Sequence, residues 1–295
     1  MIYLNLPTFG QYEYARLCIE SLLPSLGADL QLMVLDDGSP DDTAPRLQAY
    51  LSDKPYVTFL RSRTNDGCIV VRNTLMATSF GDPKVEAVIL TESDTVVHPQ
   101  TIVNLIAFWR KHPEYWMVCG VEMGTEVEHF DDFMPFDNKF PLGLHRWCLA
   151  LLPRHTYEVI GPIDTGFDRY GFDDTDYFDM IQCTPHCKPV WSTCLAPYIH
   201  LHGSHRSWFT DDRVLRGILK SRRYYISKWE ARGRDMSAMH APGNAYGDWE
   251  QRIATGESMD ALIDEAKQMS PGQLVAYTDH YRAVLNKRRI EQNGR

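Results

Sequence analysis

Short apolar runs alternate with segments of helical periodicity through the first part of the chain. The apolar runs cover residues 2–6, 31–35, 56–60, 85–90 and 117–121. The helical spacing predicts helices over residues 11–26, 43–51, 69–80 and 99–112. Strands that alternate with helices in this way predict an α/β protein with a largely parallel sheet and right-handed crossovers. A ligand crevice is then expected at the carboxyl ends of the strands.

The regular alternation stops after residue 121. Residues 122–143 are acidic and aromatic, and they precede a predicted strand at 147–152 and a predicted helix at 173–182. Because a long irregular segment inside a compact domain is commonly functional, we expect part of residues 126–140 to be a ligand-side loop. A plain surface excursion is the alternative for these residues.

The last third of the chain reads as a strand followed by helices. Apolar residues alternate with histidines over 197–207, which is typical of a strand, and the chain is helical in pattern from residue 208. Amphipathic helices are predicted at 258–269 and 271–287. We therefore expect an α/β domain over residues 1–207 and a helical extension over residues 208–295.

Composition and charge exclude several classes of protein. The chain has 295 residues, and a hydrophobic content of 44% is enough for a packed core. A net charge of -9 argues against a globally basic surface that would coat nucleic acid. No stretch approaches the roughly 18 apolar residues of a membrane span, and the chain starts in a predicted strand without a basic leader. We expect a cytoplasmic protein.

The seven cysteines are expected to be reduced thiols, because the number is odd and no export signal precedes them. Cys183, His186, Cys187 and Cys194 have the spacing C-x2-H-C-x6-C, which lacks the paired CxxC units of structural zinc sites. Small buried hydrophobic side chains are the expected role of these cysteines.

Carboxylates follow two of the predicted strands and open one of the predicted helices. Glu92 and Asp94 follow the strand at 85–90, and Asp36 and Asp37 follow the strand at 31–35. Because residues two apart on an extended chain point the same way, Glu92 and Asp94 can converge on one hard cation. A third cluster at 173–176 opens a predicted helix, where carboxylates are also favoured electrostatically without any catalytic role.

Six segments together resemble, in the same order, the motifs of the family-2 glycosyltransferases of GT-A fold. They are Pro7-Thr8-Phe9, Leu35 to Ser39, Asn65-x-Gly67 with Arg72-Asn73, Thr91 to Asp94, Ile160 to Asp164, and Tyr170 to Asp176. The resemblance covers residues 2–207 and implies a GT-A, Rossmann-like sheet flanked by helices. One motif departs from the family, because its D-x-D appears here as Glu92-x-Asp94. The metal role therefore carries over to Asp94 more directly than to Glu92.

The resemblance implies an inverting hexosyl- or pentosyltransferase that moves a sugar from a nucleotide-diphospho-sugar to an acceptor hydroxyl. A carboxylate-held Mn2+ or Mg2+ would neutralise the charge that grows on the leaving diphosphate. A base on the opposite face would take the proton of the attacking hydroxyl. Asp174 matches the family's base position, and Asp173 is the second choice.

The resemblance also implies where the donor and the metal bind. The expected donor-binding residues are Pro7, Thr8, Asp36, Asp37, Asn65, Arg72, Glu92 and Ser93. Asp36 and Asp37 are expected to meet the nucleoside, and Arg72 to approach the diphosphate. His200 and His202 lie on one face of the predicted strand, and one of them is expected to join Asp94 and Glu92 around the metal. The H-x-x-G spacing favours His200.

The acceptor stays open between a glycan, a lipid-linked phosphate, a protein hydroxyl and a hydroxylated nucleobase. Residues 206–234 carry nine basic side chains against three acidic ones. Arg216, Lys220 and Arg223 share one helical face and, with the aromatic pair 208–209, would suit a phosphate-bearing acceptor, a membrane surface or nucleic acid. The alternative is a solvated helix face whose basic residues pair with the acidic α/β domain.

Two other classes of function compete with glycosyl transfer. A nucleotidyltransferase on a similar sheet usually has a glycine-rich phosphate loop with a lysine near the first strand, and Phe9-Gly10-Gln11 supplies none. A non-catalytic nucleotide-sugar-binding module would have no need for carboxylates at every expected strand end. The sequence therefore favours a glycosyltransferase.

Overall fold

The computed structural model describes residues 1–123, 147–168, 171–186, 191–201, 212–237, 251–252 and 254–268. The chain divides into two compact units. Met1–Asp164 with Asp174–Leu201 form the first, and Thr165–Asp173 with His202–Arg295 form the second. The domain boundary that we expect after residue 207 falls outside the described residues.

An eight-stranded sheet runs through the first unit in the order β3-β2-β1-β4-β7-β6-β8-β5. Its parallel half consists of β1 (Ile2–Thr8), β2 (Leu30–Asp36), β3 (Val57–Arg61) and β4 (Ala87–Thr91). Its mixed half consists of β5 (Thr95–Val97), β6 (Val118–Met123), β7 (Leu149–Pro153) and β8 (Trp191–His200). In this half β7 is antiparallel to both β4 and β6, and β8 is parallel to β6 and antiparallel to β5. Four of the seven strand pairings among the described residues are parallel, so the predicted α/β sheet is confirmed, and the three antiparallel pairings all involve β5 or β7.

Helices join most of the strands. In order along the chain they are α1 (Tyr12–Leu22), the 3-10 helix η1 (Leu23–Ser25), α2 (Thr43–Leu51), α3 (Cys68–Gly81), α4 (Thr101–Lys111), α5 (Arg154–Ile160), α6 (Asp173–Cys183), α8 (Asp212–Glu230) and α10 (Met259–Gln268). The predicted helices within the described residues are present, whereas α5 and β5 are elements that the sequence pattern did not indicate. The helix predicted at 271–287 lies outside the described residues.

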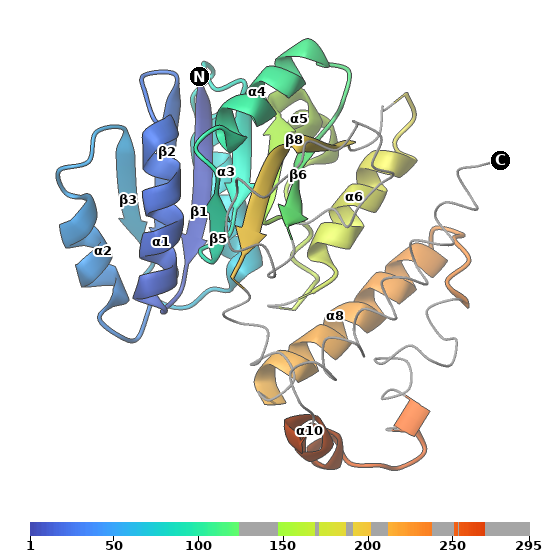
Figure 1. The fold of residues 1–295 in the computed structure, drawn as a ribbon. Helices are drawn as coiled ribbons and strands as arrows, with labels where there is room; N and C mark the ends of the chain where they lie inside the picture. Colours follow the sequence, from blue (N-terminus) through green and yellow to red (C-terminus); the bar gives the residue numbers. More distant parts are fainter. Residues whose placement is uncertain are drawn as a thin grey trace. The chain divides into compact units, whose positions relative to one another are not determined.

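Both faces of the parallel half are covered by helices, with α1 and α3 on opposite sides of the sheet (Figure 1). Leu32 and Val34 of β2 join the main core cluster, to which α1, α2 and α4 contribute. Met33 and Leu35, on the other face of the same strand, pack with Val71 and Leu75 of α3. A strand buried on both faces explains the continuous apolar runs in the sequence. The polar side chains of these segments are therefore expected near the ends of the strands.

Gly120 of β6 allows the neighbouring strands β7 and β8 to pack closely against it. The register between β6 and β8 shifts between Cys119 and Val121, as in a β-bulge. A Cβ atom at Gly120 would lie 2.6 Å from the Ala196 carbonyl oxygen and 2.6 Å from Leu149 Cδ2. Only a residue without a side chain therefore fits at position 120, between β7 and β8.

The second unit contains α8 and the short segment Thr165–Asp173. Lys220 of α8 lies 3.0 Å from the Asp168 carboxylate, and Arg216 lies 3.3 Å from Asp260. These two basic residues thus pair with acidic ones of the same unit, and a phosphate-bearing acceptor there stays a prediction. None of the described helices is long and apolar enough to cross a membrane.

Candidate active site

The parallel strands end at the same level, as the fold class requires. Thr8 at the end of β1 pairs in register with Asp36 at the end of β2, and Asn5 pairs with Leu90 of β4. A tight turn follows β4, in which the Thr95 N–H donates to the Glu92 carbonyl oxygen at 3.1 Å. The chain then enters the short strand β5, which the sequence pattern did not predict.

The pairing of β5 with β8 completes the site. Thr95 lies opposite His200, and the Leu201 N–H donates to the Asp94 carbonyl oxygen at 2.8 Å. His200 Nε2 consequently lies 3.0 Å from Asp94 Oδ1 and 3.6 Å from Glu92 Oε2. Both carboxylates thus lie near one atom, His200 Nε2, and their joint binding of a cation stays a prediction. Of the two candidate histidines, His200 lies between them, and His202 falls outside the described residues.

The charge around His200 is strongly negative. Burial alone would lower the pKa of this histidine, but its hydrogen bond with Asp94 and the nearby charges of Glu92, Asp94 and Glu122 outweigh burial and raise the pKa. The imidazole ring is 3% exposed, so these charges act on it with little screening by water. A buried cluster with three carboxylates within reach of one ring attracts positive charge.

Arg72 of α3 holds one of the carboxylates in place. Its guanidinium lies 2.6 Å from Glu92 Oε1, and the arginine side chain is 7% exposed. The sequence predicts Arg72 near the donor diphosphate, and the structure brings it to the same cluster through Glu92. The pairing uses Oε1 and leaves Oε2 directed at His200.

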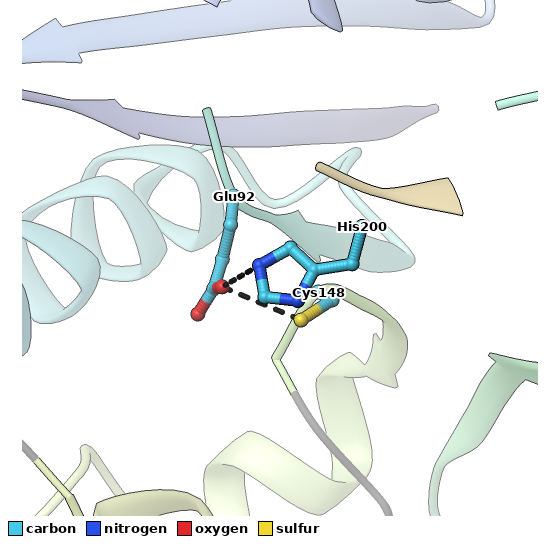
Figure 2. A group of neighbouring side chains, drawn as sticks. All are labelled: Glu92, Cys148 and His200. Atoms are coloured by element: carbon cyan, nitrogen blue, oxygen red, sulfur yellow. Dashed lines mark hydrogen bonds and ion pairs between the residues drawn. The ribbon is translucent and has the colours of Figure 1, made fainter. Parts of the chain in front are cut away.

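Cys148 is a member of the cluster that the sequence did not indicate. Its Sγ donates to Glu92 Oε2 at 3.3 Å. Glu92, Cys148 and His200 each offer one ligand atom, and these atoms lie within 4.8 Å of one another. Figure 2 shows the three side chains converging from different segments of the sheet. The antiparallel pairing of β4 with β7, where Thr91 lies opposite Leu149, brings Cys148 to Glu92, and no local pattern encodes that register.

The donor atoms fit a divalent cation. Carboxylate oxygens of Asp94 and Glu92 suit Mn2+ or Mg2+, and the His200 imidazole offers a nitrogen ligand beside them. All three side chains come from the ends of sheet strands, which holds them in place before a ligand arrives. Asp94 and His200 are both nearly buried, at 6% and 3% exposure, whereas the Glu92 side chain is 29% exposed and opens the cluster to solvent.

Asp36 and Asp37 are both buried, and both are engaged within the protein. Asp36 accepts hydrogen bonds from the Ser39 N–H at 3.0 Å and from the Ser39 hydroxyl. Asp37 accepts from the N–H groups of Asp66 and Gly67 at 2.8 and 2.9 Å. Burial raises the pKa of Asp37, although these two N–H donors act in the opposite direction. The two carboxylates therefore join the turn after β2 to the loop before α3, and their predicted contact with a nucleoside stays a prediction.

Two further residues predicted to bind the sugar donor, Asn65 and Thr8, belong to segments near the turn after β2. Gly38 has a φ of 65°, and a Cβ there would lie 2.6 Å from the Thr64 carbonyl carbon, so the loop containing Asn65 packs directly on it. Thr8 Oγ1 is buried and has no hydrogen-bond partner among the described residues. A buried hydroxyl at the end of β1 is available to a ligand at this edge.

Asp173 and Asp174 occupy the first two positions of α6, as predicted. Asp174 Oδ1 accepts from the N–H of the next residue, Thr175, at 2.7 Å. Burial raises the pKa of the Cys119 thiol in β6, and the charge of Asp174 raises it further. The catalytic role of either aspartate stays a prediction. The expected loop at 126–140 is outside the described residues.

The comparisons with known proteins agree with the motifs. Residues 4–144 match the model of glycosyl transferase family 2. Chondroitin synthase of Escherichia coli is 34% identical over 74 residues, which is 25% of this chain and 11% of that protein's length. The chain thus spans about a tenth of the curated relative that it matches.

Two solved structures share the fold. The mannosyltransferase PcManGT from Pyrobaculum calidifontis, solved with GDP-Man and Mn2+, superimposes with a TM-score of 0.61 at 13% identity, over 98% of this chain and 86% of that one. A structure of residues 1–349 of S. aureus TarS gives a TM-score of 0.52 at 16% identity, over 100% and 92% of the chains. The predicted GT-A fold is confirmed. The family-model match is confined to residues 4–144, and the solved structures show the fold alone.

Proposed function

We propose that the protein is an inverting glycosyltransferase that transfers a sugar from a nucleotide-diphospho-sugar to an acceptor hydroxyl. The observation that carries this proposal is the meeting of Glu92, Asp94 and His200 at one end of the sheet. Two of the three lie within the segment that matches glycosyl transferase family 2. A nucleotidyltransferase is less well supported, because Phe9-Gly10-Gln11 does not supply the glycine-rich phosphate loop with a lysine that such enzymes usually have.

Asp94, Glu92 and His200 would hold a divalent cation, Mn2+ or Mg2+, against the donor diphosphate. When bound, the cation supplies a Lewis acid that neutralises the charge on the leaving diphosphate. Arg72 fixes the orientation of Glu92 through the contact at 2.6 Å. Pro7, Thr8, Asp36, Asp37, Asn65 and Ser93 would surround the nucleoside and the diphosphate.

Asp174 would act as the base, with Asp173 as the second candidate. Its carboxylate takes the proton of the acceptor hydroxyl while the hydroxyl oxygen bonds to the anomeric carbon. The bond from that carbon to the donor diphosphate breaks in the same step, and the diphosphate leaves with the electron pair. Attack from the side opposite the leaving group inverts the anomeric centre. The start of a helix supports this role because it holds a carboxylate in a defined place.

The acceptor and the cellular setting belong to the same proposal. The acceptor is a hydroxyl of a glycan, a lipid-linked phosphate, a protein or a nucleobase, and the segment at 206–234 would contact it or a nearby membrane or nucleic acid. The transfer domain would cover residues 1–207 of a cytoplasmic protein, with residues 208–295 as its extension.

A donor panel tests the proposal. Thermal stability of the full chain would be measured with UDP-, GDP-, dTDP- and CDP-sugars, each with and without Mn2+. We expect one nucleotide class to stabilise the protein only when Mn2+ is present, because a ligand that binds the folded state alone raises its stability. Release of free sugar from that donor would then be measured. Failure of every nucleotide to stabilise the protein with either Mn2+ or Mg2+ would contradict the proposal.

A further inference from the structure

The thiol of Cys148 has no task in the proposed transfer. It is 2% exposed, and it donates to the oxygen of Glu92 that faces His200. A serine hydroxyl could donate the same hydrogen bond. Sulfur differs from oxygen in its preference for softer metal ions such as Zn2+.

We propose that Glu92, Cys148 and His200 form a binding site for a thiophilic divalent cation, Zn2+, which competes with the hard cation of the transfer reaction. Carboxylate oxygen, thiolate sulfur and imidazole nitrogen are all zinc ligands, and catalytic zinc sites have three protein ligands with a fourth position open to water or substrate. This inference rests on the proposed function, because it concerns the same site and states which metal ions compete for it.

The measured separations suit such an ion. Bonds of about 2.0–2.3 Å in a tetrahedron place neighbouring ligand atoms about 3.3–3.8 Å apart. Glu92 Oε2 lies 3.6 Å from His200 Nε2 and 3.3 Å from Cys148 Sγ. All three ligand atoms lie within 4.8 Å of one another, so a small movement of the sulfur or the ring would close the site.

His200 Nε2 lies 3.0 Å from Asp94 Oδ1, and the ion would replace this hydrogen bond. Arg72 pairs with Glu92 Oε1, which keeps Oε2 for the ion and fixes the carboxylate plane. On binding, the thiol proton leaves as the sulfur–metal bond forms, and the hydrogen bond between Cys148 and Glu92 is replaced by the shared ion. The three residues come from the ends of β4, β7 and β8, so the sheet holds them in place.

Competition between the two kinds of cation follows from the shared ligands. Mn2+ would use Asp94, Glu92 and His200, whereas Zn2+ would use Cys148 in place of Asp94. Because Glu92 and His200 belong to both sets, one ion excludes the other. We expect Zn2+ to abolish the Mn2+-dependent stabilisation of the protein by a nucleotide.

Co2+ provides a spectroscopic test on the full chain without any nucleotide. A thiolate–Co2+ bond produces a charge-transfer band that oxygen and nitrogen ligands alone do not give. We expect a saturable band in the wild-type protein that Zn2+ removes. Cys148→Ser should lack the band and bind Zn2+ at least about tenfold more weakly, the loss that even an outer-shell change typically causes. Cys148→Ala should behave in the same way and covers the case in which the serine variant does not fold.

Cys183→Ser is the matched control, because Cys183 is an exposed thiol in the other cluster of cysteines and histidine. It should retain the band. A wild-type protein without the band would overturn the inference, as would a band that survives Cys148→Ser and disappears in Cys183→Ser. If the band is absent while Mn2+ still supports nucleotide binding, only the zinc site is wrong. If the band is present and no nucleotide binds, the proposed function fails and the zinc site stands.

Discussion

Loss of the Arg72 guanidinium should destabilise the protein through Glu92. The two groups lie 2.6 Å apart, and Arg72 is almost fully buried between α3 and the sheet. Arg72→Met keeps most of the apolar stem and removes the charge. Glu92 would then stand beside the thiol and the imidazole without its strongest partner.

The expected cost follows from the burial of the pair. Removing one partner of a fully buried ion pair typically costs about 3–5 kcal/mol. The Glu92 side chain is 29% exposed, so water can solvate part of its charge, and the hydrogen bond from Cys148 remains. We therefore expect Arg72→Met to lower the free energy of unfolding by about 2 kcal/mol.

Urea unfolding of a double-mutant cycle measures this interaction. The cycle combines Arg72→Met with Glu92→Gln, and we expect a coupling energy of about 1–2 kcal/mol. The matched control is the pair Arg110 and Glu86, whose atoms lie 2.8 Å apart with side chains 57% and 42% exposed. Its coupling should be below about 1 kcal/mol, as for surface pairs. Equal coupling in the two cycles would refute the reasoning that burial makes the Arg72 pair strong.

Three further predictions concern the sheet, pH and the base. Gly120→Ala should lower the free energy of unfolding in urea by about 1–3 kcal/mol because its Cβ would meet two strands, whereas Gly27→Ala, with open space around it, should change it little; equal effects would contradict the bulge assignment. Burial lowers the pKa of His155, so the unfolded state binds the proton more tightly and stability should fall as pH drops below about 6.5. In urea unfolding at a series of pH values, the free energy of unfolding of His155→Gln should fall less steeply with decreasing pH. The same pH dependence in the variant and the wild type would show that His155 is not the group responsible. Asp174→Asn should cut transfer by about 10^2 or more without loss of Mn2+-dependent nucleotide stabilisation; the same pattern in Asp173→Asn alone would move the base by one residue.

The parallel half of the fold is predictable from local patterns. β1 to β4 are short apolar runs bounded by turns, and each of their ends lies within about two residues of its predicted position. The carboxylates at 92 and 94 are also predictable, because they follow a buried strand at the edge where parallel sheets bind ligands. The motif order then identified the fold class.

The mixed half depends on pairing between distant segments. β5 has three residues, too few for a periodic pattern, and it forms only because β8 lies beside it. The contact between Asp94 and His200 joins residues 106 positions apart. Cys148 reaches Glu92 through the antiparallel register of β4 and β7, which the expectation of a parallel sheet could not supply. The members of the cluster that could not be predicted from the sequence are therefore brought together by pairing between distant strands.

In the proposed function, Asp94 is a ligand of the cation through which the nucleoside diphosphate binds. Thermal unfolding of the wild-type chain and of Asp94→Ala would be compared with the best nucleotide, with and without Mn2+. At a ligand concentration about 100 times its Kd, a ligand that binds only the folded state adds about 2.7 kcal/mol of stability. Asp53→Ala, which removes an exposed carboxylate that pairs with its neighbour Lys54, is the matched control. We predict that the wild type and the control gain this stability only with Mn2+, and that Asp94→Ala loses most of it. An unchanged Mn2+-dependent gain in Asp94→Ala would contradict the account.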